Sequence, residues 1–368
     1  MANAIQLIKY IGNQWGARAL GPIARSWSPY SHLLIARDYA GWTLDVEAKA
    51  LIGLCRRLGI KTAPGAWASV SHKQAVFHVD QFVLLNPPDW GAHRVAIAYY
   101  HGIPGSGVPE FDQVFENLRK HHSRITRIQV SHRAMQDVVL GSGIEPGKVH
   151  VIPIGFDKAW FHPPDGGRRS AIRSRLGFPK NARIVGSFQK DGVGWGEGFE
   201  AKLIKGPDVF VKAMIQVHRR VPDLHVLLTG PARGYVKRSL EAAGIPYRHV
   251  LLRTYRQTAE MYHALDAYLV SSRQEGGPKA VLESMATAVP LVSTRVGQAA
   301  DLVAHGENGC LVDVDDVEGL AYWTEKVLTD ESLRSVLQAG GLKSAEAHCY
   351  TSQLPLWREF LWPLVAMR

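Results

Sequence analysis

The chain has 368 residues, a length that favours two domains over a single hydrophobic core. Its charged and apolar fractions, 21% and 46%, are ordinary for a globular protein, and no apolar run reaches the roughly 18 residues of a membrane-spanning helix. The formal net charge of +10 is spread over both halves and suits an anionic ligand, an acidic lipid surface or nucleic acid. Because no nucleic-acid-binding module is recognisable, we expect no nucleic acid partner.

Cysteine usage and the N-terminal residues bear on the compartment. Cys55, Cys310 and Cys349 form no CxxC pair and no metal-ligand spacing, so we interpret them as reduced thiols of a cytoplasmic protein. The first residues lack the long apolar region of a signal peptide. A basic run at 119–122 favours a solvated helix end. Peripheral contact with the anionic inner face of a membrane stays open as the alternative.

The first part of the chain alternates strand and helix signals. Strands are predicted at 5–11, 32–36, 74–78, 95–100, 125–130 and 149–153, and helices at 17–26, 44–58, 109–121 and 132–140. This alternation predicts a parallel sheet with helices on both faces. Ligands of such sheets lie beyond the carboxyl ends of the strands. Two loops at such ends contain Gly12 and His101; for each, a plain local turn is the alternative to a ligand contact.

The second part repeats the alternation. Strands are predicted at 183–188, 224–229, 249–252, 267–270, 289–293 and 309–312, and helices at 206–219, 279–288, 296–305, 316–329 and 331–348. We predict an N-terminal domain over 1–163, a hinge at 163–169 and a C-terminal domain over 170–350. A last helix at 351–368 is expected to cross back to the N-terminal domain.

One stretch, SSRQEGGPKAVLESMATAVPLVST at 271–294, combines a strand end, a glycine loop and a helix. Pro278 is well placed at the start of that helix. A helix N-terminus offers free backbone N–H groups and a partial positive charge, and Gly276 and Gly277 allow a ligand to approach the backbone. Glu275 stands at the mouth of this helix.

A second acidic residue, Glu283, lies about one helical turn beyond Lys279. Carboxylates only accept hydrogen bonds, so two of them along a groove suit a ligand with two sets of hydroxyls. A nucleotide sugar is such a ligand. The alternative is that Glu283 forms a surface ion pair with Lys279, worth about 0.3–0.5 kcal/mol.

The spacing Glu-x7-Glu, with glycines directly after the first Glu, resembles the donor-site motif of retaining glycosyltransferases of the GT-B fold, in the large family that includes sucrose synthase-like and mannosyltransferase-like enzymes. The segment VSHRAMQDVVLGSGIEPGKVHVIPIGFDKAWFHP at 130–163 is similar to the passage between the two domains of that family. The resemblance implies an α/β fold with two Rossmann-like domains facing across a cleft, the first for the acceptor and the second for the donor.

The resemblance also implies roles for the residues at the donor sugar. Glu275 approaches the sugar together with the amides of 276–279, and Glu283 holds the ribose hydroxyls. His101 lies beside the sugar and steadies charge around the glycosidic bond.

Further residues are implied at the diphosphate and the base. Lys205, in a Lys-Gly pair, binds the diphosphate, and Gly12 faces it. Arg253 follows the strand whose end touches the nucleobase. The family's arginine after a strand glycine is Ser187 here, and Lys190 is the nearest substitute.

The implied activity is transfer of a sugar from a nucleotide diphosphate sugar to an acceptor hydroxyl, on a saccharide or lipid-linked saccharide, with retention of configuration. No cofactor beyond the donor substrate is expected. No metal is expected either, because no Asp-x-Asp triplet falls beside the predicted ligand loops, and the one at 313–315 is interpreted as a turn. An epimerase or phosphorylase on the same fold and a non-catalytic nucleotide-sugar-binding protein stay open as alternatives.

Overall fold

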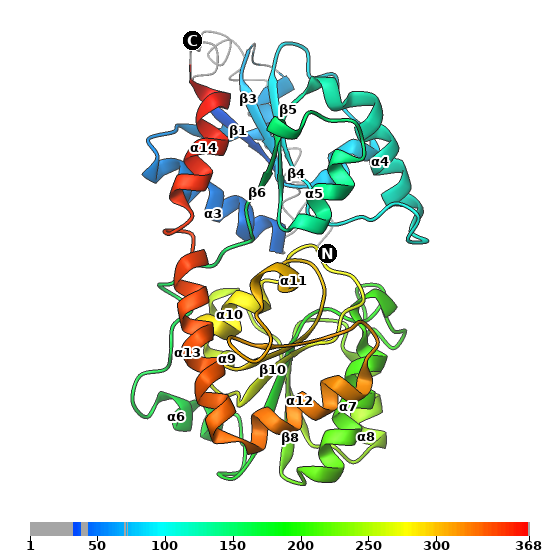
Figure 1. Ribbon diagram of the computed structural model, residues 1–368, viewed down its shortest axis with the longest axis vertical. Coiled ribbons are helices and arrows are strands. Elements are labelled where there is room, and N and C mark those ends of the chain that lie inside the picture. The colour runs from blue at the N-terminus through cyan, green and yellow to red at the C-terminus, as the bar shows by residue number, and fades with distance from the viewer. Residues whose placement is uncertain (1–31, 38–42, 70, 72, 367–368) are drawn as a thin grey trace. The chain divides into compact units, whose positions relative to one another are not determined.

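The computed structural model describes residues 32–37, 43–69, 71 and 73–366, and it divides the chain into two units (Figure 1). The first unit comprises Met1–Ile154 together with Tyr350–Arg368, and the second unit comprises Gly155–Cys349. The predicted strand at 5–11, the predicted helix at 17–26 and Gly12 lie outside the described residues.

The described part of the first unit is built on a six-stranded parallel sheet in the order β2-β1-β3-β4-β5-β6. The strands are β1 (Leu33–Ala36), β2 (Thr62–Pro64), β3 (Ala75–His78), β4 (Arg94–Ala98), β5 (Ile125–Val130) and β6 (Val149–Val151). The α-helices are α3 (Thr43–Arg57), α4 (Pro109–His121), α5 (Arg133–Leu140) and α14 (Leu354–Val365), and the 3₁₀ turns are η1 (Gly65–Ser69), η2 (Gln81–Leu85), η3 (His122–Arg124) and η4 (Pro146–Lys148).

Helices cover both faces of this sheet. Helices α3 and α14 lie on one face and α4 and α5 on the other (Figure 1). The C-terminal helix α14 inserts Phe360, fully buried, so that its ring centroid lies 5.8 Å from that of Phe77 in β3. Burying an aromatic side chain of this size provides about 2–3 kcal/mol, which explains why the last helix packs with the first unit.

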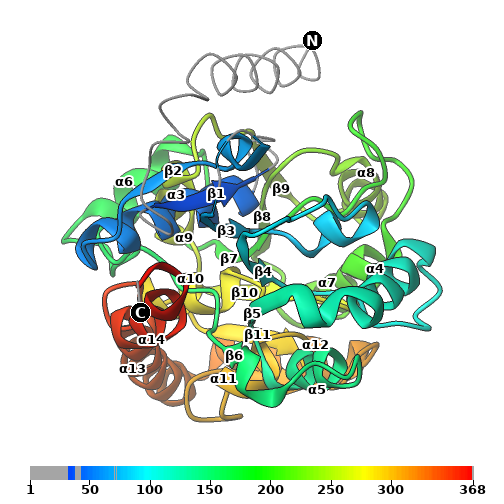
Figure 2. The ribbon, with the colours of Figure 1, turned by 90° about the horizontal axis from the view of Figure 1, so that it is seen from above.

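The second unit contains another six-stranded parallel sheet, in the order β12-β11-β10-β7-β8-β9. The strands are β7 (Arg183–Phe188), β8 (Leu224–Thr229), β9 (Tyr247–Val250), β10 (Ala267–Val270), β11 (Leu291–Thr294) and β12 (Cys310–Val312). The helices are η5 (Leu203–Lys205), α6 (Arg168–Arg175), α7 (Pro207–Arg220), α8 (Gly234–Ala242), α9 (Arg256–Tyr262), α10 (Ala280–Ala286), α11 (Ala299–Leu302), α12 (Val317–Thr329) and α13 (Glu331–His348). Helices α6, α9, α10 and α13 pack on one face, and α7, α8 and α12 on the other (Figure 2).

The division between the units falls after Ile154, earlier than the hinge predicted at 163–169. Phe156 and Phe161 are 3% and 1% exposed and belong to the core of the second unit. The ring of Phe161 lies 6.0 Å from that of Tyr262. The aromatic residues of this passage therefore fix it to the second unit. Its local sequence does not predict these long-range contacts.

The strand order of the second unit defines where a ligand can bind. From β7 the chain moves outward through β8 to β9, then returns to β10 and moves outward on the other side through β11 to β12. The order therefore reverses between the neighbouring strands β7 and β10. In open parallel sheets, ligands bind beyond the carboxyl ends of the strands at such a switch point. The connections after β7 and after β10 both begin there.

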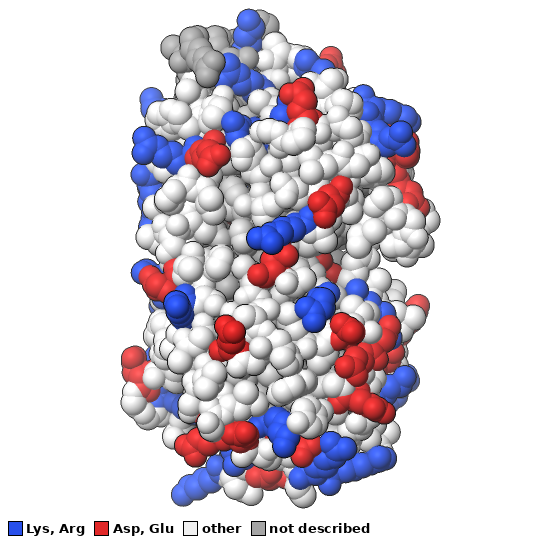
Figure 3. All heavy atoms as spheres, in the orientation of Figure 1, with Lys and Arg blue, Asp and Glu red and all other residues white. Residues whose placement is uncertain are grey.

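Charged side chains of both signs are interspersed on the face that Figure 3 displays. The net surplus of positive charge is therefore not collected into a single patch on that face. Within the described ranges, no helix is both long and apolar enough to cross a membrane.

Candidate donor site

The loop after β10 is held at the switch point by glycines. Gly206 has a φ of +59°, and a Cβ atom there would overlap the carbonyl oxygen of Ser271. Gly297 has a φ of +49°, and a Cβ atom there would lie 2.6 Å from the Gly276 oxygen and 2.7 Å from the Glu275 oxygen. Only glycine combines this conformation with so close an approach. The backbone of the loop after β10 is thus packed between the Lys205-Gly206 segment and the turn after β11.

Glu275 and Lys205 meet at this loop. The Lys205 ammonium donates to both carboxylate oxygens of Glu275 at 2.6 Å, and the Ser272 hydroxyl donates to Glu275 Oε1 at 2.8 Å. Their side chains are 13% (Glu275) and 24% (Lys205) exposed, so the pair is accessible at one side. The structure therefore brings together the two residues predicted for the sugar and the diphosphate.

Glu283 is on α10 and is 3% exposed. The hydroxyl of Tyr255 donates to its Oε1, and the hydroxyl of Tyr262 donates to its Oε2 at 3.0 Å. Burial raises the pKa of the Tyr262 phenol well above its ordinary value, and the neighbouring Tyr268 raises it further, so Tyr262 stays a hydrogen-bond donor.

The sequence interpretation missed these two tyrosines. They are spaced seven residues apart, about two turns of a helix, so they share one face of the α9 segment. That spacing, directly before the strand that leads to Glu275, is a signal that could have found them. Two tyrosines on one helix face are equally consistent with packing in a hydrophobic core, so the spacing alone does not identify a ligand site.

The remaining residues of the loop have structural contacts. Lys279 is 8% exposed, and its ammonium donates to the carbonyl of Gly155 at 2.8 Å. The Gln298 amide donates to the carbonyl of Pro278 at 3.3 Å. Helix α10 begins at Ala280, one residue later than predicted. The backbone of Gly276, Gly277 and Pro278 therefore lies between Glu275 and the helix.

An ion-pair cluster that sequence analysis missed supports the same loop. Arg273 donates to both oxygens of Asp208, at 2.9 and 2.8 Å, and also pairs with Asp315 at 2.8 Å. The hydrogen bonds from Arg273 hold the pKa of the Asp208 carboxyl below its ordinary value. Asp208 is in the first turn of α7, so this cluster joins the start of α7 to the loop after β10.

Lys190 and Arg253 contact residues other than Glu275. The Lys190 ammonium is 4.4 Å from the ring centroid of Trp195. Arg253 is exposed, and its backbone N–H donates to the side chain of Gln257 at 2.8 Å. Neither side chain forms a hydrogen bond or ion pair with Glu275 in the described part of the chain, so their predicted roles stay predictions.

The position of the missing arginine, Ser187, is contacted by an arginine from elsewhere. Arg233 follows β8, and its guanidinium donates to the Ser187 carbonyl at 2.6 Å and to the Ser187 hydroxyl at 3.1 Å. It also pairs with Asp191 at 2.9 Å, and both side chains are 0% exposed. Sequence reasoning missed Arg233, because its partner lies 46 positions away.

His101 is in the first unit, beyond the carboxyl end of β4. Gln81 accepts a hydrogen bond from the Tyr100 backbone at 3.2 Å, so its amide nitrogen faces His101 Nδ1 at 3.3 Å. This assignment places the hydrogen of a neutral ring on Nε2. The rings of Phe82 and Phe111 lie 5.6 and 5.4 Å away, so the imidazole is held in one orientation.

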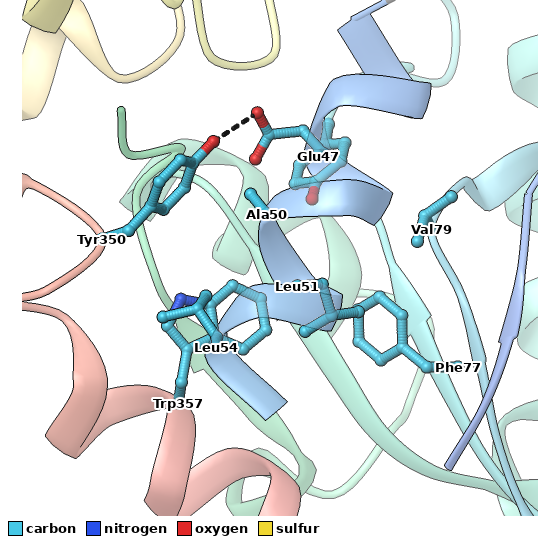
Figure 4. Close-up of a pocket in the computed structure, with 9 residues that line it drawn as sticks. Glu47, Ala50, Leu51, Leu54, Phe77, Val79, Tyr350 and Trp357 are labelled. Carbon is cyan, nitrogen blue, oxygen red and sulfur yellow. Dashed lines mark hydrogen bonds between the residues drawn. The ribbon is translucent and has the colours of Figure 1, made fainter. Parts of the chain in front are cut away.

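A small pocket of about 10 Å³ lies between α3, β3 and α14 of the first unit (Figure 4). Its walls are mainly apolar, with Leu51, Phe77 and Trp357 among them, and the Tyr350 hydroxyl donates to Glu47 at 2.8 Å at its edge. A cavity of this size has room for about one water molecule, so it is not a saccharide site. Among residues 32–37, 43–69, 71 and 73–366, no three His, Cys, Asp or Glu side chains gather as metal ligands.

Residues 198–330 match the family model described as glycosyl transferases group 1. Over this range the chain is similar to the group 1 glycosyltransferases. The range contains the Lys205–Glu275 pair and Glu283, and the predicted resemblance is thereby confirmed.

Two relatives show the extent of the likeness. A D-inositol 3-phosphate glycosyltransferase from Xylanimonas cellulosilytica is 32% identical over 215 residues, which cover 56% of this chain and 49% of the relative. The lipopolysaccharide core biosynthesis mannosyltransferase LpsB from Rhizobium meliloti is 28% identical over 201 residues, covering 52% of this chain and 54% of the relative. The match spans about half the length of these curated relatives.

Solved structures extend the likeness to both units. HepE from Anabaena in complex with UDP-glucose aligns with a TM-score of 0.72 at 16% identity, covering 90% of this chain and 99% of HepE. A glycosyltransferase from Rickettsia africae aligns with a TM-score of 0.67 at 14% identity, covering 91% and 99%. The predicted α/β architecture, GT-B with two Rossmann-like domains, is confirmed.

Proposed function

We propose that this protein transfers a sugar from a nucleotide diphosphate sugar to an acceptor hydroxyl. The observation that carries the proposal is the Lys205–Glu275 pair at the point where the strand order of the second unit reverses, on the loop that leads into the helix of Glu283. An accessible ammonium, an accessible carboxylate and a tyrosine-held carboxylate match the three parts of such a donor: the diphosphate, the sugar and the ribose.

The names of similar proteins also support this class of donor. The relatives are named as glycosyltransferases, and solved structures with the same fold were obtained with UDP-glucose and with UDP. These names describe the other proteins. Together with the site geometry they support a nucleotide diphosphate sugar as the donor here.

The roles follow from the chemistry of the broken bond. As the glycosidic bond breaks, the diphosphate gains negative charge, and Lys205 would stabilise it. Because Lys205 is paired with Glu275, donor binding would shift the ammonium from the carboxylate toward the phosphates and leave Glu275 to accept from sugar hydroxyls. Glu283 would accept from the ribose hydroxyls. His101 would hydrogen-bond the transferred sugar, as the sequence resemblance implies.

We propose retention of anomeric configuration, with the leaving phosphate taking the proton of the acceptor hydroxyl. No side chain of the donor site is an evident nucleophile, which is consistent with that mechanism. We also propose that the reaction needs no metal, that the acceptor is a saccharide or lipid-linked saccharide, and that the protein acts in the cytoplasm, with peripheral contact to an anionic membrane as one mode of reaching a lipid-linked acceptor.

The test is incubation with a panel of nucleotide sugars, scored for release of the nucleoside diphosphate with and without EDTA. Glu275→Gln is expected to slow release about 100-fold or more, because a group that stabilises the transition state is lost. Glu331→Gln, at the exposed start of α13, is the matched control. The anomeric configuration of the product, read by NMR, tests retention.

Two results would contradict the proposal. An unchanged rate in Glu275→Gln would remove that residue from the mechanism. Donor binding without any release by the unaltered protein would favour the non-catalytic alternative, which the serine at position 187 keeps open.

A further inference from the structure

The connection between β7 and α7 brings distant lysines together. The Lys202 backbone N–H donates to the Asp191 carbonyl at 2.8 Å, and the Lys205 N–H donates to the Lys202 carbonyl at 2.8 Å. The Gln189 amide also donates to the Lys205 carbonyl, at 3.2 Å. The two ends of this connection are therefore tied side by side at the carboxyl end of β7. Lys190, Lys202 and Lys205 lie on these two ends.

A buried ion pair fixes the first end of the connection. Asp191 and Arg233 are both fully buried and lie 2.9 Å apart. Arg233 also donates to the Thr229 carbonyl at 2.8 Å and to the Ser187 carbonyl at 2.6 Å. Because a buried charge that loses its partner costs about 3–5 kcal/mol, this pair resists movement of Asp191. Lys202 is hydrogen-bonded to that fixed residue.

The charges at the two ends do not balance. Lys205 is paired with Glu275, and Lys190 lies over Trp195. In the described part of the chain, the Lys202 ammonium has no ion-pair partner within 4.0 Å and no side-chain hydrogen bond. Among these three lysines only Lys205 is paired with a carboxylate, and Asp191 is already neutralised by Arg233.

The electrostatics of Lys202 agree with this count. Partial burial lowers the pKa of its ammonium, and the positive charges of Lys205 and then Lys190 lower it further, while Glu275 acts in the opposite direction. Lys202 is thus partly desolvated and repelled by its neighbours. An anionic ligand with two adjacent phosphate groups would relieve that repulsion.

We propose that Lys202 is a phosphate-binding residue and that, with Lys190 and Lys205, it forms a three-lysine subsite for a pyrophosphate group. This inference rests on the proposed function, since the pyrophosphate is that of the donor. Ammonium groups bind phosphate as point charges, so three of them can replace a guanidinium fork without its fixed geometry.

The test compares Lys202→Met with the unaltered protein by calorimetric titration of inorganic pyrophosphate, UDP and uridine. Lys202→Met is expected to weaken binding of pyrophosphate and of UDP about 10-fold or more, and to leave uridine binding unchanged, because uridine carries no phosphate. Lys202→Arg is expected to restore most of the lost affinity. Lys212→Met, an exposed lysine of α7, is the matched control. The thermal unfolding midpoint of each variant shows whether it is folded.

The outcomes separate this inference from the proposed function. If folded Lys202→Met binds pyrophosphate and UDP as the unaltered protein does, or if the unaltered protein binds neither, the subsite is wrong, whatever the rate of donor turnover. If Lys202→Met loses affinity for both while no nucleotide sugar is turned over, the subsite stands and the proposed transfer reaction fails. A loss of affinity in the Lys212→Met control as large as that in Lys202→Met would also contradict the assignment to Lys202.

Discussion

Gly206 packs closely against the end of strand β10. From this contact we can calculate roughly how much stability a larger residue at position 206 would cost. A Cβ atom at position 206 would overlap the Ser271 carbonyl oxygen and lie 2.8 Å from its carbon. The backbone φ of +59° is also a left-handed conformation that costs about 1–2 kcal/mol for alanine. Both effects oppose Gly206→Ala, and the obstructing atoms are backbone, which cannot rotate away.

Gly244 separates the two effects. It has a φ of +67°, and a Cβ atom there would meet nothing within 4 Å. Gly244→Ala therefore costs about 1–2 kcal/mol for conformation alone. Gly206→Ala adds overpacking of about 1–3 kcal/mol and loss of the Ser271 hydroxyl bond to the Gly206 carbonyl, about 1 kcal/mol. We expect Gly206→Ala to be about 2–4 kcal/mol less stable than Gly244→Ala.

Thermal unfolding, read by calorimetry so that separate transitions are resolved, measures this difference. For a unit of this size, 1 kcal/mol corresponds to roughly 2–4 °C in Tm, so the two variants should differ by about 4–16 °C. Turnover of the donor should fall in Gly206→Ala, because displacement of residue 206 also moves Lys205 away from Glu275. If the two alanine variants unfold together, Gly206 does not pack against Ser271 as described.

Two further predictions concern acidic side chains of the same unit. Arg273 lowers the folded-state pKa of Asp208 from its ordinary 3.8, so the pair stabilises the fold at neutral pH and that contribution is lost as the pH falls through the lowered value. Asp208→Asn should thus be less stable than the unaltered protein at pH 6, by up to about 1 kcal/mol because the pair is partly exposed. Chemical denaturation should show this difference in unfolding free energy disappearing below about pH 4. A difference that stays constant down to about pH 2.5 contradicts the prediction. Tyr262→Phe should lose about 1.5–3 kcal/mol and weaken donor binding, because Glu283 loses a hydrogen bond in a buried setting. Unfolding and donor titration measure both effects, and a fully stable Tyr262→Phe would mean that the phenol does not hold Glu283.

The parts of the donor site that the sequence predicted are those set by local backbone chemistry. Lys205 was predicted because its Lys-Gly pair before a helix resembles the phosphate-binding pair of the family, and the structure shows that Gly206 has a positive φ. Glu275 was predicted because glycines and a proline follow it. Each of these signals is contained within a few residues, so no knowledge of the rest of the fold was needed.

The parts that the sequence did not predict depend on contacts between distant segments. The tyrosine hydroxyls that hold Glu283 come from α9, and whether a tyrosine points to a carboxylate or into a core depends on the packing of α9 against α10. The end of the first unit at Ile154 was missed for the same reason, since Phe161 finds its partners near residue 262. Periodicity and turn signals identify elements, but they do not say which faces meet.

Two departures from the family pattern are best understood as one change. The arginine expected after Gly186 is absent, and a glycine-rich connection is present between β7 and α7. Arg233 contacts Ser187 but is fully buried and paired with Asp191, so its charge is directed at the connection and not at a ligand. The buried arginine stabilises the connection, and that connection carries Lys202. If the proposed pyrophosphate subsite is correct, its cations lie on this connection, which the buried ion pair keeps in place.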